Sequence, residues 1–209
     1  MAFTRNGYGQ VEPNQLSAQK TGQIYASLPL ASDVDILQNG EFMYYDYKSG
    51  TVTADGEGEP MLVFNEVKLY EPFWQTSYKD FAMIRVGDNY VTSRLATADY
   101  GDGAKTKGVG PNPGHSDWQA GYRMDGIAPR LFKTNVGDIF TTNMVETGNE
   151  ITYSQGDSLQ LKKVNKAADK TGNTLVLSKT GDIDALEFVV AKVYTMPDGQ
   201  QGLKLQRIK

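Results

Sequence analysis

The sequence contains no cysteine among its 209 residues. This absence excludes disulfide bonds, thiolate metal sites, iron–sulfur clusters and cysteine nucleophiles. Small secreted domains usually depend on disulfides, so a cysteine-free chain is more typical of a protein that folds in a reducing cytoplasm. The chain is nevertheless long enough to bury a stable core without covalent links.

Histidine is almost absent as well, because His115 is the only one. A single histidine excludes metal sites built from several histidines. His115 is followed by Ser116 and Asp117, which superficially suggests a catalytic triad. A triad needs three groups that converge from distant parts of the fold, and neighbours in one loop do not provide that geometry. We therefore interpret His115 as a surface loop residue.

The charges are nearly balanced, with 21 Lys and Arg against 25 Asp and Glu and a net charge of -4. Nucleic-acid binding requires clustered cations, because affinity comes from releasing the counterions of the phosphates. The densest basic cluster is Lys162, Lys163, Lys166 and Lys170, with Asp157 and Asp169 close by in the sequence. Its acidic flanks favour a solvated loop, and we expect no nucleic-acid partner.

Long apolar runs are also missing. The first ten residues hold no apolar stretch and therefore do not resemble a signal peptide. No segment approaches the roughly 20 apolar residues that a membrane-spanning helix needs. We therefore expect a soluble protein without a membrane partner and without a visible export signal.

Three short motifs weakly suggest ligands. Residues 103–110 resemble a phosphate-binding loop, but Val109, Gly110 and Pro111 stand where Lys, Ser or Thr and a helix start are needed. Asp99 with Asp102, and Asp182 with Asp184, would supply calcium ligands, but the closing bidentate glutamate is missing. We interpret all three as flexible or Asx-rich turns and expect neither metal nor cofactor.

Paired carboxylates such as Glu66 and Asp80 would allow hydrolysis of a glycosidic bond. Acidic residues are scattered over any soluble surface, however, and nothing in the pattern places two of them at working distance. We therefore predict that the protein is not an enzyme, with a hydrolase as a minor alternative.

The dominant pattern is that of short strands separated by turns rich in Gly, Pro, Asn and Asp. It predicts an all-β fold, a sandwich or barrel of short antiparallel strands with an extended N-terminal arm and a long central loop. The clearest hairpin joins 188–194 to 203–206 through the turn Met196-Pro197-Asp198-Gly199. The other predicted strands are 23–30, 41–47, 51–53, 61–70, 81–86, 90–95, 131–133, 139–145, 151–153, 159–161 and 173–179. Only 164–171 is compatible with a helical turn.

The predicted domain organisation is an extended N-terminal arm over 1–30 and a β domain over 31–209. The arm is predicted because residues 1–22 have too few apolar side chains to offset the entropy of ordering. The β domain carries the long loop 99–129, which lacks periodicity and is unusual inside a compact domain. A split into two β modules near residue 130 is the main alternative.

Tyrosine is abundant, with 12 residues, and Tyr44, Tyr45 and Tyr47 stand on both faces of one predicted strand. Such aromatics stack on sugars or anchor protein partners. They also occur in strands for purely structural reasons, and we favour that interpretation for most of them.

The opening residues 1–13, the Gln- and Ala-rich stretch from Leu16 to Leu30 and the cysteine-free β body together resemble tailed-bacteriophage virion structural proteins, in the auxiliary or decoration capsid class. The resemblance implies a structural component of a phage particle that binds and stabilises the capsid shell. Its implied partners are other virion proteins, in particular the major capsid protein, and further copies of itself. The implied location is the virion, assembled in the host cytoplasm.

An extended arm can add to the sheet edge of a neighbouring protein through main-chain hydrogen bonds. We expect this arm to order on the particle, and its sparse apolar residues are the predicted partner-binding residues: Phe3, Tyr8, Ile24, Tyr25 and Leu28. Two alternatives stay open. One is a structural protein of the tail, neck or baseplate, and the other is a carbohydrate- or host-binding β module.

Overall fold

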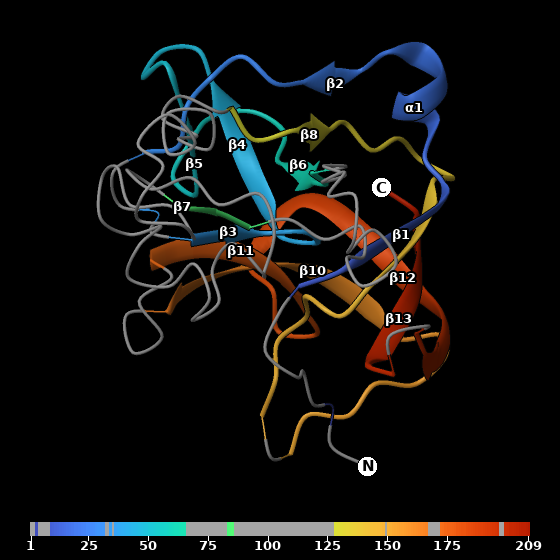
Figure 1. Cartoon of the computed structure of the whole chain (residues 1–209). Coiled ribbons are helices and arrows are strands. Elements are labelled where there is room, and N and C mark those ends of the chain that lie inside the picture. The colour runs from blue at the N-terminus through green and yellow to red at the C-terminus, as the bar shows by residue number, and fades with distance from the viewer. Residues whose placement is uncertain are drawn as a thin grey trace, which may run out of the picture.

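The structure is a computed structural model, and it describes residues 3, 9–31, 34, 36–65, 83–85, 128–148, 150–166, 172–196 and 199–209. Its elements are shown in Figure 1. In chain order they are β1 (Val11–Gln15), α1 (Ser17–Thr21), β2 (Ile24–Tyr25), β3 (Ile36–Gln38), β4 (Phe42–Asp46), β5 (Thr51–Thr53), β6 (Met61–Val63), β7 (Met83–Arg85), β8 (Leu131–Phe132), β9 (Ile139–Thr142), β10 (Ser158–Lys166), β11 (Gly172–Ser178), β12 (Ile183–Thr195) and β13 (Gln201–Arg207).

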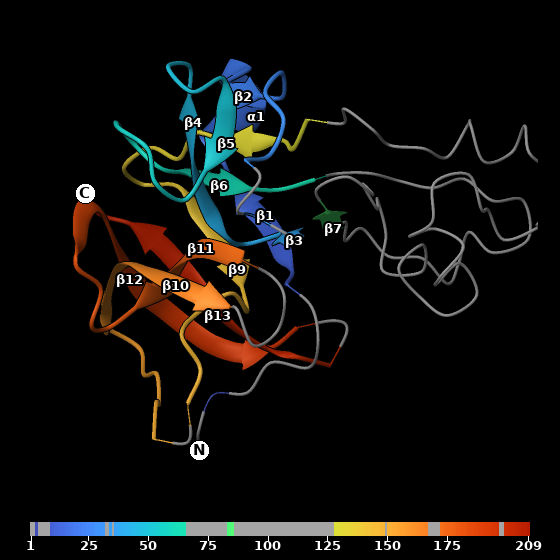
Figure 2. The same cartoon turned by 90° about the vertical axis from the view of Figure 1, so that its left-hand side faces the viewer.

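The all-β prediction is confirmed, since 49% of the structure is strand and 4% is helix. The main sheet is antiparallel and curls into a half-barrel, with strand order β1-β9-β13-β12-β10-β11-β4-β6-β8-β2 and β5 paired to β4. A separate two-stranded sheet pairs β3 with β7. Figure 2 shows the curl, with β2, β4, β5 and β8 above β10, β12 and β13.

One sheet contains strands from both sides of residue 130. β11 pairs with β4 through Leu175 and Phe42, and β6 pairs with β8 through Leu62 and Phe132. The two halves of the chain are therefore interleaved in the described part, rather than stacked as consecutive modules.

Three phenylalanines from distant strands form the centre of the core. Phe42 of β4, Phe140 of β9 and Phe188 of β12 are fully buried, with ring centroids 5.5 to 6.2 Å apart. Each such side chain stabilises the fold by about 2–3 kcal/mol through burial. This cluster explains why the sheet curls, because its inner face must surround the three rings.

The predicted C-terminal hairpin is confirmed in β12 and β13, which pair from Phe188↔Arg207 to Thr195↔Gln201. Gly199 has φ 84°, a conformation that favours glycine. The N–H of Met196 donates to the carbonyl of Gln200 at 2.7 Å and closes the turn.

Two local predictions are wrong. Residues 151–153 form no strand; the N–H of Ile151 donates to the carbonyl of Gly148 at 3.1 Å and its carbonyl accepts the N–H of Phe3 at 3.0 Å. Residues 164–166, predicted as part of a helical turn, continue β10, where Val164 pairs with Thr174 of β11. Ladder hydrogen bonds outweigh the weak helix preference of this short stretch.

Three short elements are not among the predicted ones, namely β1, α1 and β3. Each is polar or very short and carries little periodic signal. The predicted loop 99–129 and the predicted strand 90–95 lie outside the described residues, apart from residues 128 and 129.

Candidate functional site

The boundary between residues 9–25 and residues 131–142 is here called the seam. β1 and β2 end the strand order on either side, yet they follow one another in sequence and are joined by α1. Their partners β9 and β8 are likewise consecutive and are joined by residues 133–138. Residues 9–25, here called the closing segment, thus run antiparallel to residues 131–142 along the rim of the sheet (Figure 1).

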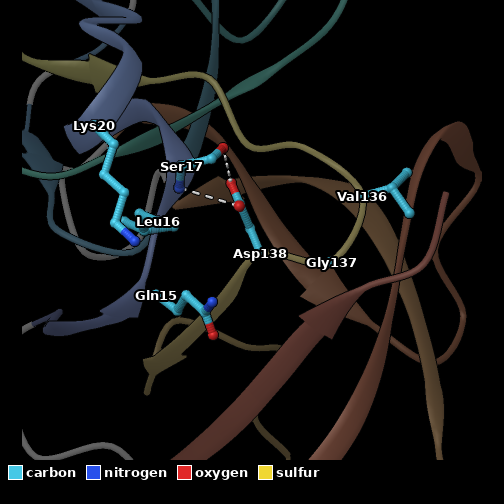
Figure 3. A pocket seen from close by; sticks show the side chains of 7 residues that line it. All are labelled: Gln15, Leu16, Ser17, Lys20, Val136, Gly137 and Asp138. Carbon is cyan, nitrogen blue, oxygen red and sulfur yellow. Dashed lines mark hydrogen bonds between the residues drawn. The ribbon is translucent and has the colours of Figure 1, made fainter.

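Asp138 holds the seam at the start of α1, whose N-cap residue Leu16 provides no side-chain hydrogen bond. The Asp138 carboxylate accepts the N–H of Ser17 at 3.0 Å and its hydroxyl at 2.9 Å (Figure 3). It also accepts the N–H of Asn135 at 2.9 Å. A carboxylate from the connection that precedes β9 therefore caps the helix in place of a side chain of its own N-cap residue.

A hollow of about 260 Å³ lies beside this contact. Figure 3 shows its lining, which is Gln15, Leu16, Ser17, Lys20, Val136, Gly137 and Asp138. The Ser17 hydroxyl donates to Asp138 and accepts from the Asn135 amide at 2.7 Å, with no imidazole between acid and hydroxyl. Activation of a serine requires a base at that position. The arrangement is therefore suited to stabilising the seam.

Arg207 of β13 fixes the other side of the seam. It is 8% exposed, and its Nη1 donates to Glu59 at 2.5 Å and to the carbonyl and hydroxyl of Thr134. The main chain of Arg207 also bonds Gly137 and Asp138. The 133–138 connection is consequently anchored on both flanks.

The predicted extended N-terminal arm of residues 1–30 is paired with the body in its described part. The described part of 1–30 is largely extended in β1 and β2, but it is paired and packed against the body of the protein. Val11, Leu16 and Ala18 are buried at 6%, 2% and 0% exposure. These few apolar side chains occupy core positions, so they contribute more than their number suggests.

Two of the five predicted partner-binding residues lie at the N-terminal end. Phe3 is 2% exposed and meets the Tyr153 ring edge-to-face at 5.4 Å, while its N–H donates to the carbonyl of Ile151 at 3.0 Å. It is therefore a core residue in this structure. Tyr8 lies outside the described residues.

The other three, Ile24, Tyr25 and Leu28, are partly buried and pack against the main core. Ile24 and Tyr25 form β2 and pair with Phe132 and Leu131. The structure thus brings three of the predicted residues together at one edge of the sheet, and Phe3 lies elsewhere.

Tyr25 belongs to an aromatic row that reaches the surface. Its ring centroid lies 5.2 Å from that of Tyr45, which lies 5.1 Å from that of Tyr47. The Tyr45 hydroxyl accepts the N–H of Ser27 at 3.0 Å. Tyr47 is 74% exposed, the highest value among the large hydrophobic side chains of the described part. We call Tyr25, Tyr45 and Tyr47 the tyrosine ridge.

A polar cluster joins Glu146 to Lys162 and Ser178 through hydrogen bonds. Glu146 accepts the ammonium of Lys162 at 2.6 Å and the hydroxyl of Ser178. Partial burial raises the pKa of Glu146, but the hydrogen bonds from Lys162 and Ser178 outweigh it, and the net pKa is lowered. The cluster joins β10 and β11 to residue 146 and is structural in character.

The weak ligand motifs gain no support from the described residues. Asp184 forms an ion pair with Lys209, and no group of three or more potential metal ligands occurs in the part of the chain described. His115, the 103–110 motif, Asp99, Asp102, Glu66 and Asp80 lie outside it. Among the described residues, no helix is long and apolar enough to cross a membrane.

Comparison with known proteins adds no relative: no protein-family model, no curated protein and no solved structure matches this chain.

Sequence reasoning singled out Tyr25 and named Tyr45 and Tyr47 as possible anchors, but it did not connect them. The seam residues Asp138, Ser17 and Arg207 were missed, because they come together only through pairing of distant strands.

Proposed function

We propose that this chain is a structural component of a tailed-phage particle, an auxiliary or decoration protein that binds and stabilises the capsid shell. It acts through contact surface and shape and has no reaction of its own. Its partners are other virion proteins, chiefly the major capsid protein, and further copies of the chain. It is located in the virion, which assembles in the host cytoplasm.

The tyrosine ridge is the observation that carries this proposal. Large aromatic side chains dominate the energetics of protein interfaces when a partner desolvates them. Tyr47 presents such a ring to solvent and packs edge-to-face on Tyr45, which in turn packs on Tyr25. The ridge also contains Tyr25, one of the residues predicted from sequence to contact a partner.

The internal use of charged groups supports a contact role as well. Glu146 pairs with Lys162, Arg207 with Glu59, and Asp138 with the start of α1. Groups held in this way stabilise a rigid platform, and a rigid platform limits the entropy lost on docking.

The test uses shells purified from the phage that encodes this chain, stripped of it or assembled without it. Wild type and Tyr47→Ala are titrated onto these shells, and bound protein is measured by co-sedimentation and quantitative gel. We expect Tyr47→Ala to weaken binding by about 30-fold, as for an interface residue worth about 2 kcal/mol. Tyr47→Phe should retain most of the binding.

The matched control is Ile208→Ala, which removes an exposed apolar side chain from another part of the surface. It should bind like wild type. Absence of the chain from purified particles would overturn the proposal. Copy number separates the alternatives, since hundreds of copies per particle indicate the shell, whereas one or two rings indicate the tail, neck or baseplate.

A carbohydrate-binding role is the second candidate, because an exposed tyrosine ring also stacks on sugars. The hydroxyls of Ser49 and Thr51 lie 2.9 Å apart in the turn that follows Tyr47 and add polar groups nearby. Binding of the isolated protein to a glycan array, lost in Tyr47→Ala, would favour this role over shell binding.

A further inference from the structure

The strands of the closing segment each pair with the body along one edge, while its buried side chains Val11, Leu16 and Ala18, and Phe3 before it, pack into the core. Its strands β1 and β2 pair with β9 and β8 and occupy the two ends of the sheet order. The rest of the sheet, from β9 through β13 and β12 to β8, is continuous without it. Pro13 within β1 fits an edge strand, because proline cannot donate a ladder hydrogen bond.

The body recognises the main chain of this segment with side chains. The N–H of Gly9 donates to Gln38 Oε1 at 2.6 Å, and the N–H of Gln10 donates to Asn143 Oδ1 at 2.8 Å. Asp138 accepts the N–H of Ser17 in the same manner. Gln38, Asn143 and Asp138 are all at least 95% buried. The body therefore presents a formed groove that binds an extended segment whichever copy of the chain supplies it.

The groove is selective for this sequence. A side chain at position 9 would collide with the carbonyl of Asn39 and approach Met144 Sδ to 2.8 Å, so glycine is required there. Further along the segment, Leu16 and Ala18 fill buried positions with 2% and 0% exposure. A second copy of this chain carries the same glycine and the same apolar residues at the same spacing.

Residues 26–31 connect the closing segment to the body and must separate from it for release. They are held by hydrogen bonds from Ser27 to Tyr45 and between Pro29, Ala31 and Val52, by a parallel bridge of Leu30 with Val52, and by packing of Leu28, Leu30 and Ala31 against the core. Freed and extended, these residues span about 20 Å. The five-residue helix α1 is too short to persist alone, so a released segment gains its structure only in a groove.

We propose that residues 9–25 are an exchangeable segment, which leaves its own groove together with the buried Phe3 and closes the same groove of a second copy of this chain. The contacts are identical in both arrangements, so exchange costs mainly the entropy of association. The inference deepens one part of the proposed function, the association with further copies. It concerns the chain alone, so it is tested without any shell.

The experiment uses the absence of native cysteine. Gln15, which is exposed, pairs across the seam with Ile139, which is half-exposed. Facing residues of antiparallel strands have a Cα separation of about 5 Å, which suits a disulfide. Full-length Gln15→Cys and Ile139→Cys proteins are mixed at high concentration and oxidised. Covalent species are separated on a non-reducing gel, and their linkages are assigned by peptide mass spectrometry.

Exchange predicts a mixed dimer linked from position 15 to position 139, enriched at least tenfold over the control pair. The control is Lys192→Cys mixed with Lys204→Cys, a facing pair of similar exposure within the β12–β13 hairpin, which should give almost no mixed dimer. Adding Gly9→Ala to the Gln15→Cys protein should abolish the mixed dimer, because the altered segment no longer fits the groove.

The double variant carrying both changes in one chain shows whether the bond forms. If it closes internally at all concentrations and the mixture gives no 15–139 dimer, the proposal is wrong. If oxidation fails even in the double variant, a short bis-maleimide cross-linker replaces it in the same mixtures, with the same two outcomes. The cross-linking experiment does not measure shell binding, so a result that contradicts segment exchange leaves the proposed function untouched.

Discussion

Asp138 and Ser17 form two hydrogen bonds across a sequence separation of 121 residues, one to the main chain and one to the side chain of Ser17. This contact fixes the start of the only helix in the described part and links the closing segment to the connection that precedes β9. The buried carboxylate of Asp138 therefore contributes directly to the stability of the seam, beside Arg207 and the strand pairing.

Replacing Asp138 by Ala should lower the free energy of unfolding by about 2 kcal/mol, because three donors lose a charged acceptor. Urea unfolding followed by circular dichroism measures this change. Asp182→Ala, at an exposed carboxylate, is the control and should stay within about 0.5 kcal/mol of wild type. Equal stability of the two variants would contradict the capping role of Asp138.

Gly40→Ala should be more destabilising than Gly58→Ala. Both residues have positive φ, 93° and 99°, so both variants incur backbone strain of about 1 kcal/mol. A Cβ at position 40 would also collide with Thr142 Oγ1 and approach Met144 Cγ to 3.0 Å, whereas position 58 has open space. We expect a further loss of about 1–3 kcal/mol at position 40. The difference in urea midpoints, at constant m value, isolates the steric part.

Stability at acid pH should depend on Glu146. Its pKa is lowered in the folded protein, so its contribution is present above its ordinary value of 4.5 and is lost as the pH falls through the folded value. Glu146→Gln should therefore flatten the fall of unfolding free energy on the acid side. The same titration of Glu150→Gln, at an exposed neighbouring position, should follow wild type. Parallel curves for wild type and Glu146→Gln would rule out this assignment.

Phe3→Ala should cost about 3 kcal/mol, because it removes a ring that is 2% exposed and packed on Tyr153. Thermal unfolding of the isolated protein provides the measurement. Ile208→Ala, at a side chain 46% exposed, should change stability far less. If Phe3 instead contacted only a partner, its loss would leave the isolated protein unchanged and reduce shell binding alone.

The fold class could be predicted from sequence because strand signals are local. Alternating or β-branched stretches such as those of β4, β11 and β12 can be recognised as strands from a few consecutive residues. The order of the strands could not be predicted, since the pairing of Leu175 with Phe42 depends on the curl of the whole sheet. The same limit applies to the seam, where Asp138 meets Ser17 only after the strands on its two sides have paired.

Only part of the tyrosine ridge could be predicted from the sequence. Tyr45 and Tyr47 stand on one face of a strand by simple alternation. Tyr25 joins them only through the edge pairing of β2 with β8. The low apolar content of the N-terminal residues suggested a free arm, but a count of apolar residues does not reveal that Val11, Leu16 and Ala18 occupy core positions.

The distance along the chain between the closing segment and its partners has a consequence during synthesis. Gln10 bonds to Asn143, 133 residues later, so the closing segment is synthesised well before the residues with which it pairs. At typical elongation rates of 5–20 residues per second, that wait lasts about 7–27 s. Throughout it, Val11 and Leu16 are exposed, and neighbouring nascent chains on one polysome present them to each other.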